Sequence, residues 1–165
     1  MNNKLKRGPL ISAGLFLGMG LGGFLDGILF HQILQTHNML SASIPVVDLI
    51  SAKINMTWDG YFHAGVWLLT LIGVYLLFSA GRRQDVIWSG RILAGSMLGG
   101  WGLFNLVEGV IDHQLLGIHH VMEYAINKLP YDLAFLASGV ILILIGWLLV
   151  KSGSQESVQN HEAEI

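Results

Sequence analysis

Long apolar runs separated by short polar segments make up most of the chain. Four runs are long enough to cross a bilayer as helices: Leu10–Gln32, Tyr61–Ala80, Ile92–Asp112 and Leu133–Val150. A hydrocarbon core about 30 Å thick needs roughly 20 such residues in a helix. The pattern therefore predicts an all-α membrane protein with four transmembrane helices in a single domain, residues 1–152. The polar segment 153–165 is expected to be a disordered tail.

Polar positions recur in register along these runs. An acid, a His-Gln pair and a second His close the first run, and the same set closes the third run 82 residues later. The corresponding residues are Asp26 and Glu108, His31 and His113, and His37 and His119. The second and fourth runs correspond at an offset of 73, in Trp58-Asp59 and Tyr131-Asp132. We therefore expect two parallel hairpin repeats, about 10–80 and 92–150, in a pseudo-two-fold four-helix bundle.

Glycine placement predicts which helices meet. Gly14, Gly18 and Gly22 recur at every fourth residue of the first run, and Gly95 and Gly99 do so in the third. Small residues at this spacing let membrane helices approach closely. The first and third helices are therefore expected to pack face to face.

Basic residues are distributed unevenly, and this predicts the orientation of the helices. One set of run ends carries Lys4, Lys6, Arg7, Arg82, Arg83, Arg91 and Lys151, and the other carries only Lys53 and Lys128. Loops rich in Lys and Arg stay in the cytoplasm. Both termini are thus expected to be cytoplasmic, with the recurring histidines on the extracytoplasmic side of the cell membrane.

Composition narrows the range of partners and chemistry. The chain has 165 residues, of which 53% are hydrophobic and 12% charged, and its net charge is −2. This balance is typical of a small integral membrane protein in contact with lipid, and it gives no broad basic surface for nucleic acid. The chain has no cysteine, which excludes disulfides, thiolate nucleophiles and cysteine-bound metals. A membrane-protein partner or a homo-oligomer stays open.

The recurring acids and histidines predict a transition-metal site near the outer face. Imidazole and carboxylate ligands suit copper, iron or zinc without distinguishing among them. The candidate ligands are Asp26, His31, His37, His63, Glu108, Asp112, His113, His119 and His120. On one continuous helix His37 would share a face with Asp26, but His31 would be rotated by about 140°. A straight helix therefore cannot direct all three side chains to one point.

Other interpretations use the same residues. His31 with His113, or His37 with His119, could be axial ligands of haem b in an electron-transfer protein. The polar residues could instead only hydrogen-bond to one another in a non-catalytic membrane scaffold. Acids within spans also suit an ion pathway, although no charged series crosses to the inner face. The sequence does not decide among a redox enzyme, a metal-delivery protein and a structural metal site.

The paired motifs resemble those of a family of uncharacterised prokaryotic four-span membrane proteins, catalogued as a domain of unknown function. The motif residues are Asp26, His31-Gln32 and His37-Asn38 in the first half, and Glu108, His113-Gln114 and His119-His120 in the second. The resemblance covers nearly the whole chain apart from the polar tail. It implies membrane location and the four-span plan, and it brings no established activity.

Overall fold

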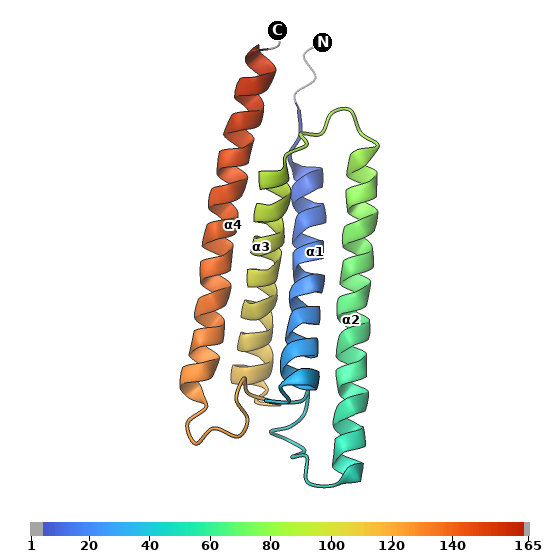
Figure 1. Ribbon diagram of the computed structural model, residues 1–165, viewed down its shortest axis with the longest axis vertical. Helices are drawn as coiled ribbons and strands as arrows, with labels where there is room; N and C mark the ends of the chain where they lie inside the picture. The colour runs from blue at the N-terminus through green and yellow to red at the C-terminus, as the bar shows by residue number, and fades with distance from the viewer. Residues whose placement is uncertain (1–4, 164–165) are drawn as a thin grey trace.

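The computed structural model describes residues 5–163, with side chains through residue 155, and the elements in this range are helices. They are α1 (Gly8–Asp26), η1 (Gly27–Ile33), α2 (Leu49–Gly81), α3 (Gly90–Glu108), η2 (Gly109–Leu115) and α4 (Leu129–Ala163). The short elements η1 and η2 are π-helices that continue α1 and α3 without a break. The four long helices run side by side along the molecule (Figure 1).

Helix α2 begins earlier than the apolar pattern predicts. The second span was expected to start at Tyr61, but α2 starts at Leu49. The side chain of Asp48 accepts a hydrogen bond from the backbone of Ser51 at 2.8 Å, and the Ser51 hydroxyl accepts one from the backbone of Asp48 at 3.0 Å. This capping box starts a helix regardless of hydropathy, so hydropathy alone missed the first turns.

Helix α4 is also longer than expected. It starts at Leu129 and continues to Ala163, through much of the segment 153–165 for which the sequence predicted disorder. Ser, Gln and Glu without proline can extend an existing helix. Residues 164–165 of that segment lie outside the described residues.

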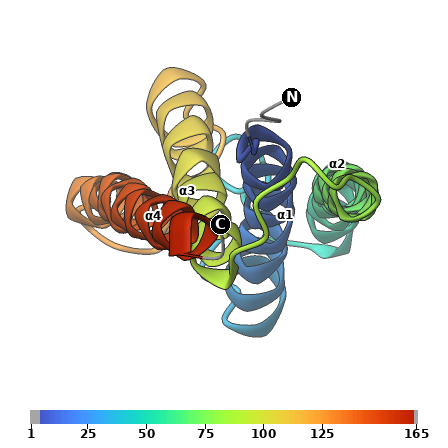
Figure 2. The same ribbon diagram turned by 90° about the horizontal axis from the view of Figure 1, so that it is seen from above.

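The helices form a row in the order α4, α3, α1, α2 (Figure 2). Within the described residues, α1 packs against α2 and α3, and α3 also packs against α4. The backbone of α2 does not approach that of α3 or α4, although the Phe62 ring centroid of α2 lies 6.0 Å from the Phe104 ring centroid of α3. The central pair is therefore α1 and α3, as the glycine pattern predicts. The four helices do not surround one common core, which differs from the bundle expected from the sequence.

Glycines bring the two central helices together. A methyl group at Gly18 of α1 would overlap the backbone of Met97 in α3, and one at Gly100 of α3 would overlap the backbone of Leu15 in α1. The two contacts are reciprocal, since each glycine lies 82 residues from its counterpart. Helices α1 and α3 consequently meet backbone to backbone.

A second set of glycines faces the flanking helices. Gly20 of α1 lies against Val66 of α2, and Gly102 of α3 lies against Gly139 of α4. These contacts correspond at offsets of 82 for the central helices and 73 for the flanking ones. Because both central helices have small residues on two faces, each holds two neighbours closely. The four long helices are therefore arranged in a row and not around a common axis.

The exterior of the row suits lipid. In the part of the chain that the structure describes, three helices are long and apolar enough to cross a membrane, over Gly8–Ile33, Leu49–Gly81 and Leu129–Gln155. Among the described residues, buried polar side chains outnumber buried apolar ones, while many large apolar side chains of α2 and α4 are exposed. This distribution is the reverse of that in a soluble domain. The helices therefore imply a bilayer environment.

Helix α3 does not reach the hydropathy of the other three. Glycines and polar residues such as Asn105 and Glu108 lower its mean value. These side chains are buried because α3 lies between α1 and α4.

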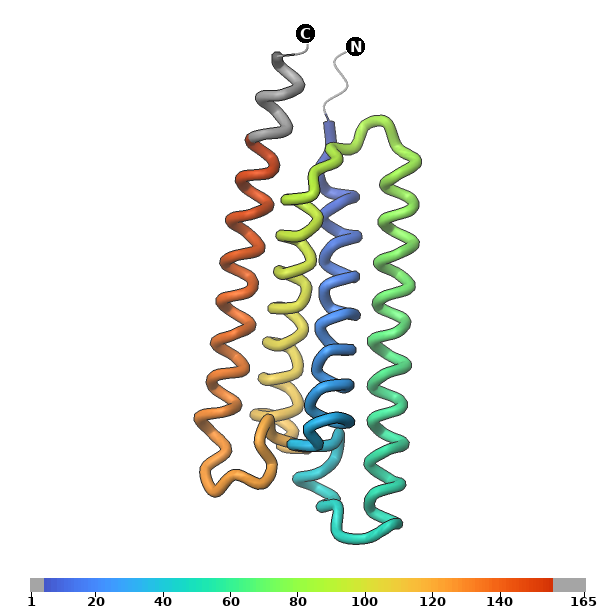
Figure 3. Tube along the Cα trace, viewed as in Figure 1, coloured from blue at the N-terminus to red at the C-terminus, as the bar shows by residue number. Residues whose placement is uncertain are grey.

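The connections divide between the two ends of the row. The loop between α2 and α3 lies at one end, where α1 begins, and the segments 34–48 and 116–128 lie at the other (Figure 3). At the first end Lys6 bonds through its backbone to Asp85 and Ile87, above a small apolar cluster of Leu10, Ala80, Val86 and Ile92. The recurring acids and histidines lie at the opposite end.

Candidate metal centre

A π-helical turn brings the first acid and histidine together. In η1 the hydrogen bonds reach back five residues, as from the Leu34 amide to the Leu29 carbonyl at 2.8 Å. In an α-helix His31 would be rotated about 140° from Asp26, but the wider π turn aligns residues five apart more closely. Asp26 Oδ2 consequently lies 3.3 Å from His31 Nε2.

The second half has the same turn. In η2 the Leu116 amide donates to the Ile111 carbonyl at 2.8 Å. His113 follows Glu108 by five residues, and both belong with His119 to a group whose ligand atoms all lie within 4.8 Å of one another. π-Turns inside α-helices occur frequently at functional sites. In both halves the π turn directs the acid and the histidine five residues later toward the same side, which a straight α-helix would not do.

The second histidine of each motif comes from a loop. Beyond each π-helix one residue has a positive φ, 51° at Gln35 and 57° at Gly117. The chain turns back there, so the helices do not continue to His37 and His119. The shared face of His37 and Asp26 required one continuous helix, and this condition is not met, because the helix ends at Ile33.

The backbone of the opposite half holds each loop histidine. His37 Nδ1 donates to the Val121 carbonyl at 3.0 Å, and His119 Nδ1 donates to the Met39 carbonyl at 3.1 Å. A carbonyl only accepts, so Nδ1 carries the proton and Nε2 keeps its lone pair. Burial, with a smaller effect of the nearby His31, lowers the pKa of His37 to about 4, and burial together with His37 also lowers the pKa of His119. Both rings are therefore neutral near pH 7, the form that binds metal.

Buried carboxylates on the flanking helices lie behind the other two histidines. Asp59 of α2 accepts a hydrogen bond from His31 Nδ1 at 2.8 Å, and Asp132 of α4 lies 3.7 Å from His113 Nδ1. Metal-binding histidines typically have such a carboxylate on their outer nitrogen. Neither acid was predicted as a site residue, although their correspondence at an offset of 73 was the signal that could have indicated them.

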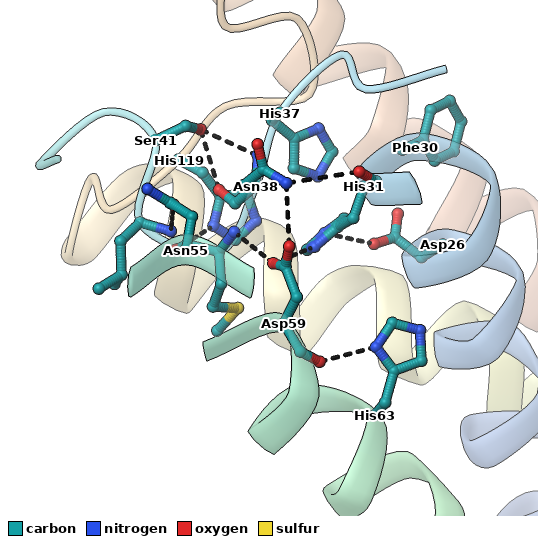
Figure 4. Close-up of polar contacts among 12 residues, drawn as sticks. Asp26, Phe30, His31, His37, Asn38, Ser41, Asn55, Asp59, His63 and His119 are labelled. Carbon is teal, nitrogen blue, oxygen red and sulfur yellow. Dashed lines mark hydrogen bonds and ion pairs between the residues drawn. The ribbon is translucent and has the colours of Figure 1, made fainter. Parts of the chain in front are cut away.

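Seven buried atoms converge between the two halves without a hydrogen-bond partner among the described residues. They are Nε2 of His31, His37, His113 and His119, Oδ2 of Asp26, and Oε1 and Oε2 of Glu108. We call these six residues the inner cluster; each is at most 5% exposed. Figure 4 shows several of them directed toward one another. An unpartnered buried polar atom costs about 1–3 kcal/mol, so this arrangement favours a bound cation.

The inner cluster contains three overlapping sets of possible ligands. They are His31 with His37 and His119, Glu108 with His113 and His119, and Asp26 with His31 and Glu108. Within each set the ligand atoms lie within 4.8 Å of one another. Ligands about 2.0–2.2 Å from a shared zinc ion are separated by no more than twice that distance. Small side-chain movements would complete each set.

The other three predicted ligands lie outside the inner cluster. His63 donates through Nδ1 to the backbone carbonyl of Asp59 at 2.7 Å. His120 donates through Nδ1 to Asp132 at 2.7 Å. Asp112 is only partly buried and belongs to none of the three sets. The structure thus brings together six of the nine predicted residues and leaves these three at its edge.

Comparison with known proteins agrees with the membrane character of the chain. No curated protein and no solved structure matches it. A family described as "Predicted membrane protein (DUF2243)" matches residues 13–153, which confirms the resemblance that the paired motifs indicate. The chain therefore belongs to this family of predicted membrane proteins.

Proposed function

We propose that the inner cluster binds transition-metal ions at the extracytoplasmic face of the cell membrane and that the protein has a redox or metal-handling role. The observation that carries this proposal is the convergence of seven unpartnered ligand atoms, four of them imidazole nitrogens. The outer nitrogens of His31, His37 and His119 are meanwhile hydrogen-bonded. Imidazole and carboxylate without thiolate suit iron, copper or zinc.

The distribution of charge supports the proposed side of the membrane. The inner cluster lies at the end of the row opposite the connection that carries Arg82 and Arg83. The positive-inside rule places that connection in the cytoplasm. In this arrangement α3 crosses the bilayer as a fourth span, with its polar residues shielded by α1 and α4. The reciprocal glycine contacts support two hairpin repeats about a pseudo-two-fold axis.

The geometry gives less support to the two alternatives. A scaffold whose polar residues satisfy one another would not leave seven inner atoms without partners. A haem with His31 or His37 as an axial ligand needs open space around that ring. The His37 ring centroid lies 4.4 Å from that of His31 and 4.8 Å from that of His119, so neighbouring imidazoles fill the space that a porphyrin would occupy.

Metal analysis of the full chain, purified in detergent and loaded with iron, copper or zinc, tests the proposal. We expect stoichiometric metal, and less of it in His31→Ala and in His113→Ala. Gln32→Ala and Gln114→Ala are matched controls, because these exposed neighbours of the two histidines should leave metal content unchanged. Protein that stays metal-free after loading would overturn the proposal. A Soret band in the visible spectrum would favour haem instead.

A further inference from the structure

We infer that the inner cluster is a two-ion centre in which the Glu108 carboxylate bridges the metals. The inference rests on the proposed function and deepens it, because it assigns the number of ions and the shared ligand. Its basis is the way in which the three ligand sets overlap.

Any two of the three ligand sets share one residue, which is His31, His119 or Glu108. A histidine can serve two ions only through both ring nitrogens. Nδ1 of His31 is bonded to Asp59, and Nδ1 of His119 is bonded to the Met39 carbonyl. Each of these histidines therefore has only Nε2 available and can bind one ion.

Glu108 differs from the shared histidines. A carboxylate can accept two ions, one on each oxygen, and both Oε1 and Oε2 of Glu108 are buried without a hydrogen-bond partner. Of the three sets, the two that can be filled together are thus those that share Glu108. One ion is then bound by Asp26, His31 and Glu108, and the other by Glu108, His113 and His119.

His37, the sixth residue of the inner cluster, lies beside both proposed ion sites. The His37 ring centroid is 4.4 Å from that of His31 and 4.8 Å from that of His119. Its free Nε2 can therefore complete either coordination sphere. Glu108 is one methylene longer than Asp26, the acid at the corresponding position of the first half.

The charge of the centre also fits two ions. Four carboxylates lie in or directly behind the inner cluster, each at most 5% exposed: Asp26, Asp59, Glu108 and Asp132. Among the described residues, the ion pairs of these carboxylates are all with histidines. Uncompensated buried charge is costly. Two divalent ions balance four carboxylates, whereas one leaves two negative charges. Carboxylate-bridged pairs are an established plan in helical proteins, with ions about 3.5–4 Å apart.

The experiment uses the full chain in detergent, stripped with a chelator and titrated with Cu(II), the divalent ion that binds such ligands most tightly. Bound copper per chain is measured by mass spectrometry, and the paramagnetic resonance intensity per bound ion is measured on the same sample. We expect two copper ions per chain and an intensity per ion well below that of isolated Cu(II), because adjacent ions couple magnetically.

Each outcome of the wild-type titration decides a separate point. One ion per chain would overturn the two-ion inference and leave the proposed function in place, whereas no bound ion would overturn both. Two ions with full, uncoupled intensity would overturn the bridge. Glu108→Gln should bind at most one ion without coupling. Asp112→Asn is the matched control, since this partly buried acid four residues further on belongs to no ligand set and should keep two coupled ions.

Discussion

In both hairpins a buried carboxylate of the flanking helix lies behind the first histidine, but the two carboxylates accept hydrogen bonds from different donors. In the first half, Asp59 accepts hydrogen bonds from His31 at 2.8 Å, from the Met39 amide at 2.8 Å and from the Asn38 side chain at 2.9 Å. All three donors lie in one short stretch of the same hairpin. The carboxylate therefore fixes both the histidine and the loop that follows it.

In the second half the corresponding carboxylate serves different donors. Asp132 accepts from the Val121 amide at 3.1 Å and from His120 at 2.7 Å. His120 occupies the position of Asn38, and Asp132 lies 3.7 Å from His113, beyond hydrogen-bond distance. The comparison shows that the framework around the centre recurs while the orientation of its histidines does not. His31 is firmly oriented by its hydrogen bond to Asp59, whereas neither ring nitrogen of His113 has a hydrogen-bond partner among the described residues.

The largest expected effect is a difference in zinc affinity between variants of these two carboxylates. Asp59→Asn should weaken zinc binding by about 10- to 100-fold, because loss of an outer carboxylate on a metal-binding histidine typically has this effect. Asp132→Asn should weaken it less, since Asp132 does not hydrogen-bond to His113. Competition against a chromophoric chelator measures both affinities, with thermal unfolding as the control for folding. Equal losses would show that the two halves contribute alike.

The glycine contacts between the central helices predict equal effects in the two halves. Gly18→Ala and Gly100→Ala should each destabilise the protein by about 1–3 kcal/mol, because the added methyl group overlaps the backbone of the other helix. Gly99→Ala is the control, since its nearest contact would be 3.7 Å away, at Leu15. Unfolding in mixed detergent micelles measures the three free energies. A strong effect at only one of the two paired positions would contradict reciprocal packing.

A smaller difference is expected at the turns after the π-helices. Gln35 and Gly117 both have positive φ, 51° and 57°, a conformation that favours glycine. Gln35→Gly should therefore stabilise the protein and Gly117→Ala destabilise it, each by about 1 kcal/mol. The same unfolding measurement detects both changes. Changes of the same sign at the two positions would contradict the structure of these turns.

The smallest effect is expected at a position where the two halves have different side chains. His63 corresponds to Leu136 in the second hairpin, and its Nδ1 is bonded within its own helix. His63→Leu should leave metal content unchanged, because His63 belongs to none of the three ligand sets. Metal analysis of the variant beside His31→Ala provides the comparison. A loss of metal in His63→Leu would restore this residue to the candidate ligands.

The correspondence between the two halves of the sequence indicated which side chains lie near one another. The α-helical period did not indicate the backbone geometry that brings them together. The offset of 82 pairs Asp26 with Glu108, and the structure places both in one ligand set with His31. Their role as metal ligands stays a prediction. The π-turns were not predicted, because a period of 3.6 residues assumes an unbroken α-helix.

The fold was predictable to a similar extent. Apolar runs located the four long helices, and glycine spacing indicated the central pair. The row was not predicted because the second glycine face, at positions such as Gly20 and Gly102, is not recognisable until the neighbours are known. The early start of α2 depends on the Asp48 cap, which hydropathy does not detect.

The exchange of hydrogen bonds between the two loops has a consequence for assembly. Each half supplies the carbonyl that holds the other half's loop histidine, and the Ala42 and Glu123 amides donate across to the Ile118 and Thr36 carbonyls. Neither hairpin alone therefore contains the hydrogen-bond acceptor that holds its own loop histidine. If the chain were cut between α2 and α3, ion capture would require the two fragments to meet, and a captured ion would in turn resist their separation.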